Sequence, residues 1–152
     1  MKIKILIILL FILIMLAFGF LVFNQFYSQE DHILVGDVNF TLPPGFHEGT
    51  INSIGDVNIT NGTHTLFIAY YNDNNITKYV QMYTNGSNQT NYTYSISNFT
   101  IDDIFVCKAV NDQGGAEHFW FVKNNHVYSV YDWEKYDDID RIFFDLIKSS
   151  DY

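Results

Sequence analysis

The stretch from Glu117 to Trp133 reads EHFWFVKNNHVYSVYDW, and it decides the fold. Two apolar runs, HFWFV and VYSVYDW, stand on either side of Asn124-Asn125. Asparagine tolerates the left-handed backbone conformation of tight turns, so this pair predicts a hairpin. The runs are apolar at successive positions, which indicates strands that are covered on both faces. We therefore expect these two strands to lie centrally in a β-sheet.

Other strands follow from similar patterns on either side of this hairpin. Val57 to Tyr71 contains the runs VNIT and TLFIAYY, split by Asn61-Gly62, and this arrangement predicts a second hairpin. Asp37 to Leu42 alternates between polar and apolar residues and ends at Pro43-Pro44-Gly45, which suits a tight turn. Two more apolar segments predict two more strands, Tyr92 to Phe99 and Ile104 to Val110.

One predicted helix lies between the second hairpin and the later strands. Ile76, Tyr79, Val80 and Tyr83 recur at helical spacing and give one apolar face. Before this face, Asp73 or Asn74 is expected to accept hydrogen bonds from the first helical turn, and Gly86 is expected to end the helix.

A second predicted helix ends the chain. Its apolar positions follow helical spacing, and Asp132 is expected to cap its start, with further acids in the first turns. Together the elements predict an α+β fold, with an antiparallel sheet of about six strands covered by two helices. The sequence leaves open whether the helices cover one face of the sheet or both. The apolar positions of the predicted C-terminal helix are Ile139, Ile142, Phe143, Leu146 and Ile147.

The N-terminus reads as a transmembrane anchor. Residues Ile5 to Phe23 carry neither a charge nor a hydrogen-bonding side chain, and as a helix they would extend about 28 Å. Lys2 and Lys4 precede this span, so the positive-inside rule leaves residues 1–4 in the cytoplasm. A cleaved signal peptide is the alternative, but no small-residue cleavage pattern follows the span. Beyond the anchor we expect a stalk, residues 24–32, and an extracytoplasmic domain, residues 33–152.

Composition excludes some classes of protein. The net charge of -9 argues against nucleic acid as a partner, because phosphate binding needs clustered lysine and arginine. Cys107 is the sole cysteine, so the chain can form no internal disulfide and cannot build a cysteine-based zinc site. Apolar neighbours indicate that Cys107 is a buried side chain of a strand rather than a reactive thiol.

The chain contains eight Asn-x-Ser/Thr sequons, all on the predicted exported side. Three of them stand end to end in NGSNQTNYT, Asn85 to Thr93, which reads as an exposed loop. An AT-rich genome and a need for turns also enrich asparagine, but they explain less well why Ser or Thr follows at the right offset. We expect N-glycosylation at some of them. The candidates are Asn61, Asn75, Asn85, Asn88 and Asn91.

The sequence predicts no catalytic, cofactor-binding or metal-binding residue. The five histidines lack the short spacings of zinc ligands, and no nucleophile signature surrounds Cys107. The acidic run from Asp132 to Asp140 lacks the glycine and the alternating oxygen ligands of a calcium loop, so a helix start explains it better. The many tyrosines could line a sugar-binding face, although strand preference and core packing explain their placement first.

The segment Leu42-Pro43-Pro44-Gly45-Phe46, followed by a hairpin, a helix, four strands and a terminal helix, resembles the Mog1/PsbP-like fold over about residues 33–150. The chain also resembles small membrane-anchored surface proteins of methanogenic archaea, which share the LP-x-GF start, the NG hairpin and an FWFVKN-type hairpin. The second group implies no function. The first implies a binding or accessory protein, although a fold alone does not give function.

These features favour a single-pass membrane protein whose N-terminus is cytoplasmic and whose C-terminal domain lies outside the cell. Its predicted role is a binding or accessory module, with a surface protein or a glycan as partner and with no cofactor. Two alternatives stay open. One is a hydrolytic or redox enzyme with an unrecognised site, and the other is a subunit of a membrane complex that uses the anchor helix as a contact.

Overall fold

The structure, a computed structural model, describes residues 10–19, 31–51, 55–86 and 92–150. The chain divides into an N-terminal unit, Met1–Glu30, and a folded unit, Asp31–Tyr152. In the N-terminal unit, residues 10–19 form a helix, and the rest of the predicted anchor lies outside the described residues. Among the described residues, no helix combines the length and the hydrophobicity that crossing a membrane requires.

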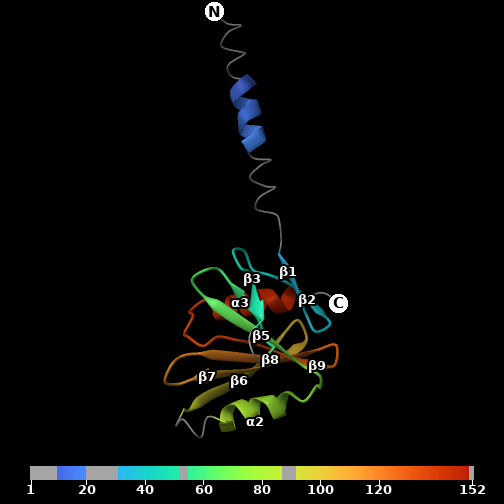
Figure 1. Cartoon of the computed structure of the whole chain (residues 1–152), viewed down its shortest axis with the longest axis vertical. Helices are drawn as coiled ribbons and strands as arrows, with labels where there is room; N and C mark the ends of the chain where they lie inside the picture. The colour runs from blue at the N-terminus through green and yellow to red at the C-terminus, as the bar shows by residue number, and fades with distance from the viewer. Residues whose placement is uncertain (1–9, 20–30, 52–54, 87–91, 151–152) are drawn as a thin grey trace, which may run out of the picture. The chain divides into compact units, whose positions relative to one another are not determined.

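The folded unit has the predicted α+β architecture (Figure 1), but its sheet is larger than expected. Seven antiparallel strands follow the order β3-β4-β5-β9-β8-β7-β6, and β1 and β2 form a separate hairpin. The prediction that β8 and β9 lie centrally is confirmed. The strands are β1 His32–Val35, β2 Val38–Thr41, β3 His47–Ile51, β4 Val57–Thr60, β5 Thr65–Tyr71, β6 Tyr94–Ile101, β7 Ile104–Asn111, β8 Glu117–Lys123 and β9 His126–Tyr131.

The expected sheet of about six strands was too small because β3, at its edge, carries a weak sequence signal, and β1 of the separate hairpin was also not predicted. Strand β3 is exposed at nearly every position and contains a bulge, so it lacks the hydrophobic alternation of a half-buried strand. Strand β1 starts at His32, directly after Asp31, whose backbone oxygen accepts a hydrogen bond from the Leu42 N–H.

The turns explain why the two predicted hairpins form. Asn124 and Asn125 both have positive φ, 51° and 65°, and they close a two-residue turn between β8 and β9. At the β4–β5 hairpin the loop is four residues long, and the Asn61 side-chain oxygen accepts hydrogen bonds from the N–H groups of Thr63 and His64. Asparagine thus shapes both turns, in two different ways.

One face of the sheet packs against α3 (Ile139–Lys148) and the β1–β2 hairpin. The predicted apolar face of α3 is confirmed, because all five of its apolar positions are buried. The expected cap was wrong: α3 begins after Asp138, and Asp132 lies six residues earlier, at the end of β9. The chain between them crosses from the sheet to the helix and is not itself helical.

The opposite face packs against α2 (Ile76–Gly86), so the two helices cover opposite faces of the sheet. The predicted face of α2 contacts Trp120, Ala109 and Cys107 in the sheet. Its N-cap is Asn75 and neither Asp73 nor Asn74, since the Asn75 Oδ1 atom accepts a hydrogen bond from the Lys78 N–H at 3.1 Å.

Candidate binding site where β5 and β9 diverge

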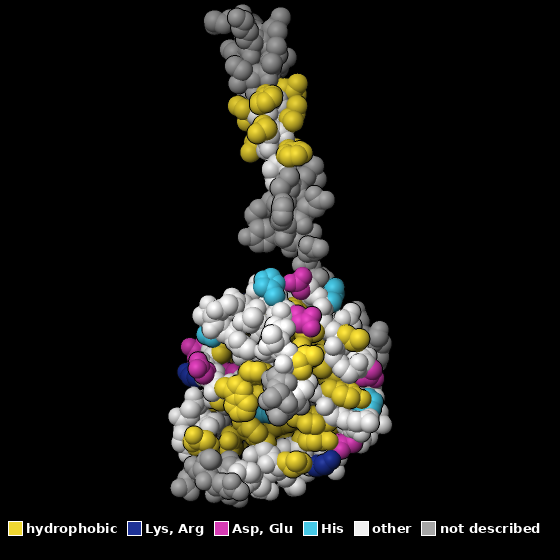
Figure 2. All heavy atoms as spheres, viewed as in Figure 1, with side chains coloured by type: hydrophobic (Ala, Val, Ile, Leu, Met, Phe, Trp, Pro, Cys, Tyr) yellow, Lys and Arg dark blue, Asp and Glu magenta, His cyan; other side chains and the backbone are white. Residues whose placement is uncertain are grey.

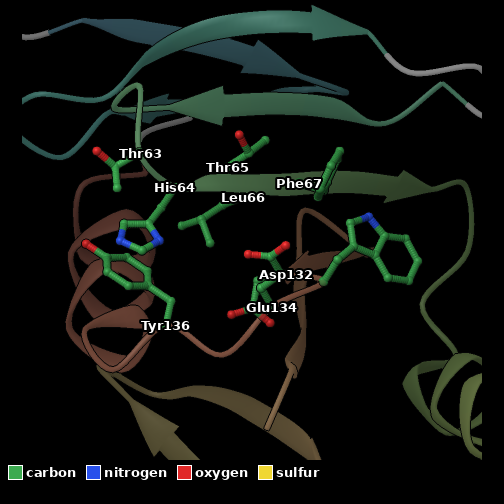
Figure 3. A pocket seen from close by; sticks show the side chains of 9 residues that line it. Thr63, His64, Thr65, Leu66, Phe67, Asp132, Glu134 and Tyr136 are labelled. Carbon is green, nitrogen blue, oxygen red and sulfur yellow. The ribbon is translucent and has the colours of Figure 1, made fainter. Parts of the chain in front are cut away.

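A pocket opens where two neighbouring strands stop pairing. Strand β9 pairs with β5 as far as Phe67↔Tyr131, whereas β5 itself begins two residues earlier, at Thr65. After Tyr131 the chain leaves the sheet toward α3, and a space of about 350 Å³ lies between it and β5 (Figure 3). The described residues that line this strand-end pocket are Thr63, His64, Thr65, Leu66, Phe67, Asp132, Trp133, Glu134 and Tyr136.

Asp132 is the most unusual group in the strand-end pocket. It is only 4 % exposed, although it carries a carboxyl group. Its Oδ1 atom accepts a hydrogen bond from the Glu117 N–H at 2.7 Å. Its buried Oδ2 atom has no hydrogen-bond partner among the described residues. The pKa of Asp132 is raised to about 6, mainly by burial; the hydrogen bond from the Glu117 N–H opposes this rise, and the charge of Glu117 adds to it.

The pocket combines two carboxyl groups with no lysine or arginine among its described lining residues. Figure 3 shows Asp132 and Glu134 in the middle of the pocket, with the His64–Tyr136 pair on one side of them and Phe67 on the other. Lys135, which directly follows Glu134 in the sequence, pairs with Asp137 at 2.9 Å. The described residues contain no group of three histidine, cysteine or acidic side chains that could hold a metal ion.

Aromatic rings flank these acids. His64 and Tyr136 stack with ring centroids 3.9 Å apart, which joins the β4–β5 turn to the segment before α3. Phe67 stacks on Tyr131 and meets the edge of Trp133, whose side chain is 63 % exposed. Figure 2 shows hydrophobic side chains gathered over the middle of the folded unit, where Figure 1 places β5, β8 and β9. Partly accessible aromatic rings beside carboxyl groups suit the recognition of a ligand.

Cys107 and His118 show no sign of a nucleophilic site among the described residues. Cys107 lies in an apolar groove with Val80 and Phe105, and burial raises the pKa of its thiol. His118 stacks between Trp120 and Tyr131, and neither of its ring nitrogens has a hydrogen-bond partner among the described residues. Burial lowers the pKa of His118 well below its usual value, so the ring is neutral. A neutral thiol without a hydrogen-bonded base is a poor nucleophile.

The glycosylation candidates lie partly within the described residues. Asn61, Asn75 and Asn85 are exposed, in the β4–β5 turn, at the start of α2 and at its end. Asn88 and Asn91 lie outside the described residues. The side-chain oxygens of Asn61 and Asn75 accept the hydrogen bonds that shape the turn and the cap. Those bonds do not use Nδ2, the atom to which an N-linked glycan is attached.

The strand-end pocket was not predicted from the sequence, because Asp132 and Glu134 stand before an amphipathic helix, where acids usually mark the helix start. The available signal was local. An aspartate directly follows the apolar strand β9, and a tryptophan comes next. A carboxyl group at that position is buried by the strand end rather than solvated by a helix terminus. What sequence could not supply was the register, which stops β9 short of β5 and creates the space.

The order of elements and their layering define a PsbP-like fold. The solution structure of cyanobacterial PsbP (CyanoP) from Synechocystis sp. PCC 6803 is similar, with a TM-score of 0.51 and 11 % sequence identity. The match covers 80 % of this chain and 91 % of that chain. No protein-family model matches the chain, and no curated protein matches it in sequence. The resemblance predicted from Leu42–Phe46 and the element order is thus confirmed for the fold.

Proposed function

We propose that this chain is a membrane-anchored, N-glycosylated binding module, with its folded unit outside the cytoplasm and its ligand site in the strand-end pocket. One observation carries the binding role: a buried carboxyl group, Asp132, keeps one oxygen without a hydrogen-bond partner among the described residues and lines a pocket flanked by the exposed Trp133 and by half-buried aromatic rings. Such pockets, with few polar groups among aromatic ones, are typical ligand sites.

The anchor is proposed from the continuous apolar run, Ile5 to Phe23. The described part of that run, residues 10–19, is helical and apolar on every side, which supports the proposal. A helix that is hydrophobic all round is stable where lipid or protein covers it. Export of the folded unit follows from the lysines that precede the run.

Intact-mass measurement tests anchoring and glycosylation together. The chain should be extracted from the membranes of the organism that makes it and should weigh more than 17.7 kDa, in sugar-sized steps. A mass of 17.7 kDa would refute glycosylation and keep the anchor. A mass lower by about the first two dozen residues would refute the uncleaved anchor.

Tryptophan emission tests the binding site itself. The chain has two tryptophans, Trp133 at the pocket and Trp120 buried in the sheet, so a Trp133→Phe variant isolates the pocket signal. A survey of cationic, neutral and sugar probes on the full chain in detergent should find a class that shifts the emission of the wild type and not that of the variant. If no probe does so, the proposed binding role of this pocket is wrong.

A further inference from the structure

Asp132 is a costly residue to bury in this way. A carboxylate that leaves water loses its hydration, and a single backbone N–H replaces only part of it. The other hydrogen-bonding position, Oδ2, has no partner among the described residues. Asparagine would keep the bond to the Glu117 N–H without the charge, since its Oδ1 atom is also an acceptor. The charge on Asp132 is therefore unexplained by the fold.

The lining shows which group would complete this site. A positively charged group in the pocket would compensate the charge of the Asp132 carboxyl group that lines it, and Glu134 adds a second carboxyl group beside it. The lining aromatic rings attract cations through their faces. The net charge of the chain, -9, raises the local concentration of cations in the same direction.

We propose that the strand-end pocket binds an organic cation, namely an ammonium or guanidinium group carried on an apolar stem. The inference rests on the proposed binding function and names its ligand class. Asp132 and Glu134 receive the charged end, while Phe67 and Trp133 contact the stem. The group belongs either to a lysine or arginine side chain of a partner polypeptide or to a free polyamine, which present the same chemistry.

The size of the pocket favours this ligand over a sugar chain. Its volume of about 350 Å³ is near the lower end of the range for small-molecule sites, roughly 300–1,000 Å³. One long side chain fits that space better than several sugar rings. An anion is disfavoured by the two carboxyl groups, and a metal ion lacks a third ligand among the described side chains.

The test compares matched probes on the full chain in detergent, read by Trp133 emission and by calorimetry. N-acetyl-lysinamide, N-acetyl-argininamide and spermidine carry the cation, N-acetyl-norleucinamide has the stem alone, and maltotriose represents sugars. Asp132→Asn is expected to weaken cation binding at least about tenfold and Glu134→Gln about threefold or more. Asp145→Asn, the same charge change on the exposed face of α3, should leave affinity within about twofold.

The outcomes separate the ligand class from the binding role. Stronger binding of the amino-acid amides indicates a partner side chain, and stronger binding of spermidine indicates a free polyamine; either result supports the proposal. If the lysine and norleucine amides bind equally well, the proposal of a cationic ligand is wrong. It is also wrong if Asp132→Asn and Asp145→Asn lose the same affinity for the cationic probes. A response to maltotriose alone would overturn the ligand class and keep the binding role. If none of the five probes binds, both the proposed ligand class and the proposed binding role of the pocket are wrong.

Discussion

The core beneath α3 and the strand-end pocket are built by the same central strands, yet they treat burial in opposite ways. In the core, β8 and β9 contribute Phe119, Phe121 and Val130, all fully buried among apolar side chains of α3 and the β1–β2 hairpin. One residue past the end of β9, the chain instead buries the Asp132 carboxyl group beside an open space. Burial stabilises the fold in the first region and opposes it in the second.

This difference indicates where a small fold can accommodate a polar ligand site. Removing apolar area from water stabilises a protein by about 25 cal/mol per Å², so burial in the core offsets the conformational entropy that the whole unit loses on folding. A strand end is a better location for polar groups, because pairing has already ended there and a side chain can face a space without disrupting the sheet. The pocket begins at the last β5–β9 pair, Phe67↔Tyr131.

The largest effect is expected from a cavity in the core. Phe143 is fully buried and stacks on Phe119, with ring centroids 4.1 Å apart. Phe143→Ala removes this ring from a site that cannot collapse easily, so the free energy of unfolding should fall by about 3–5 kcal/mol. Urea unfolding of the full chain in detergent, followed by far-UV circular dichroism, measures the loss.

The adjacent residue provides the matched control. Phe144 has the same side chain but is 36 % exposed, and it makes an edge contact with Phe99. Phe144→Ala should cost about 1 kcal/mol, because its ring loses much less buried area. Equal losses for the two variants would contradict the assignment of the core to the Phe143 side of α3.

The second prediction has the opposite sign and comes from the strand-end pocket. Asp132→Asn should stabilise the chain at pH 7.5, by at most about 3 kcal/mol, which is what a pKa raised from 3.8 to about 6 implies. Between about pH 4 and pH 6 the folded state holds a proton that the unfolded state has released, and above that range the folded state must bury the charged carboxylate. The wild type therefore loses stability as pH rises from about 4 to above 6, and the asparagine variant avoids this loss.

The pH dependence of the free energy of unfolding distinguishes removal of the buried Asp132 charge from a gain in stability that is independent of this charge. The advantage of Asp132→Asn should shrink toward zero as pH falls to about 4, where the wild-type carboxyl group is protonated in both states. Glu117 and Lys108 lie near Asp132 and are present in both proteins, so the difference between them reports on the Asp132 charge in this surrounding. Asp145→Asn serves as control and should show no such trend. A destabilised Asp132→Asn at pH 7.5 would show that the buried charge is already compensated in the free protein.

Much of the fold could be predicted from the sequence because its central elements carry strong local signals. The β8–β9 hairpin has two asparagines at positive φ between apolar runs, and α2 and α3 show clear helical spacing. The exposed strand β3 has no hydrophobic pattern, and it was missed. That the helices cover opposite faces also had to come from the structure, because tertiary packing and not local periodicity decides it.

The candidate site could not be predicted because it depends on register. Two segments about 65 residues apart in sequence meet at Phe67↔Tyr131, and the pocket exists because pairing stops there. In sequence terms Asp132 resembles a helix cap, which is the commoner role for an aspartate before an amphipathic segment. Its burial and its bond to the Glu117 N–H became visible only with the sheet assembled.

The smallest effect is expected on α2, remote from both regions, and it gives the scale of an ordinary local interaction. Asn75 caps this helix through its Oδ1 atom and is also the acceptor of a sequon that ends at Thr77. Asn75→Ala should lower the free energy of unfolding by about 1 kcal/mol, because the Lys78 N–H loses its acceptor. Asn75→Asp keeps an acceptor and should unfold near the wild type.

Two further comparisons separate the cap from a glycan at the same residue. Thr77→Ala destroys the sequon and leaves the Asn75 cap intact, so in a glycosylating host it should remove the same mass as Asn75→Asp. If stability depends on the cap, Asn75→Ala alone unfolds at lower urea concentration. If Thr77→Ala and Asn75→Asp both have a lower free energy of unfolding than the wild type, by equal amounts, the sugar stabilises the helix. If Asn75→Ala lowers the free energy of unfolding by about 1 kcal/mol, an ordinary polar substitution in this fold is destabilising. A rise in the free energy of unfolding of Asp132→Asn would then be specific to the strand-end pocket.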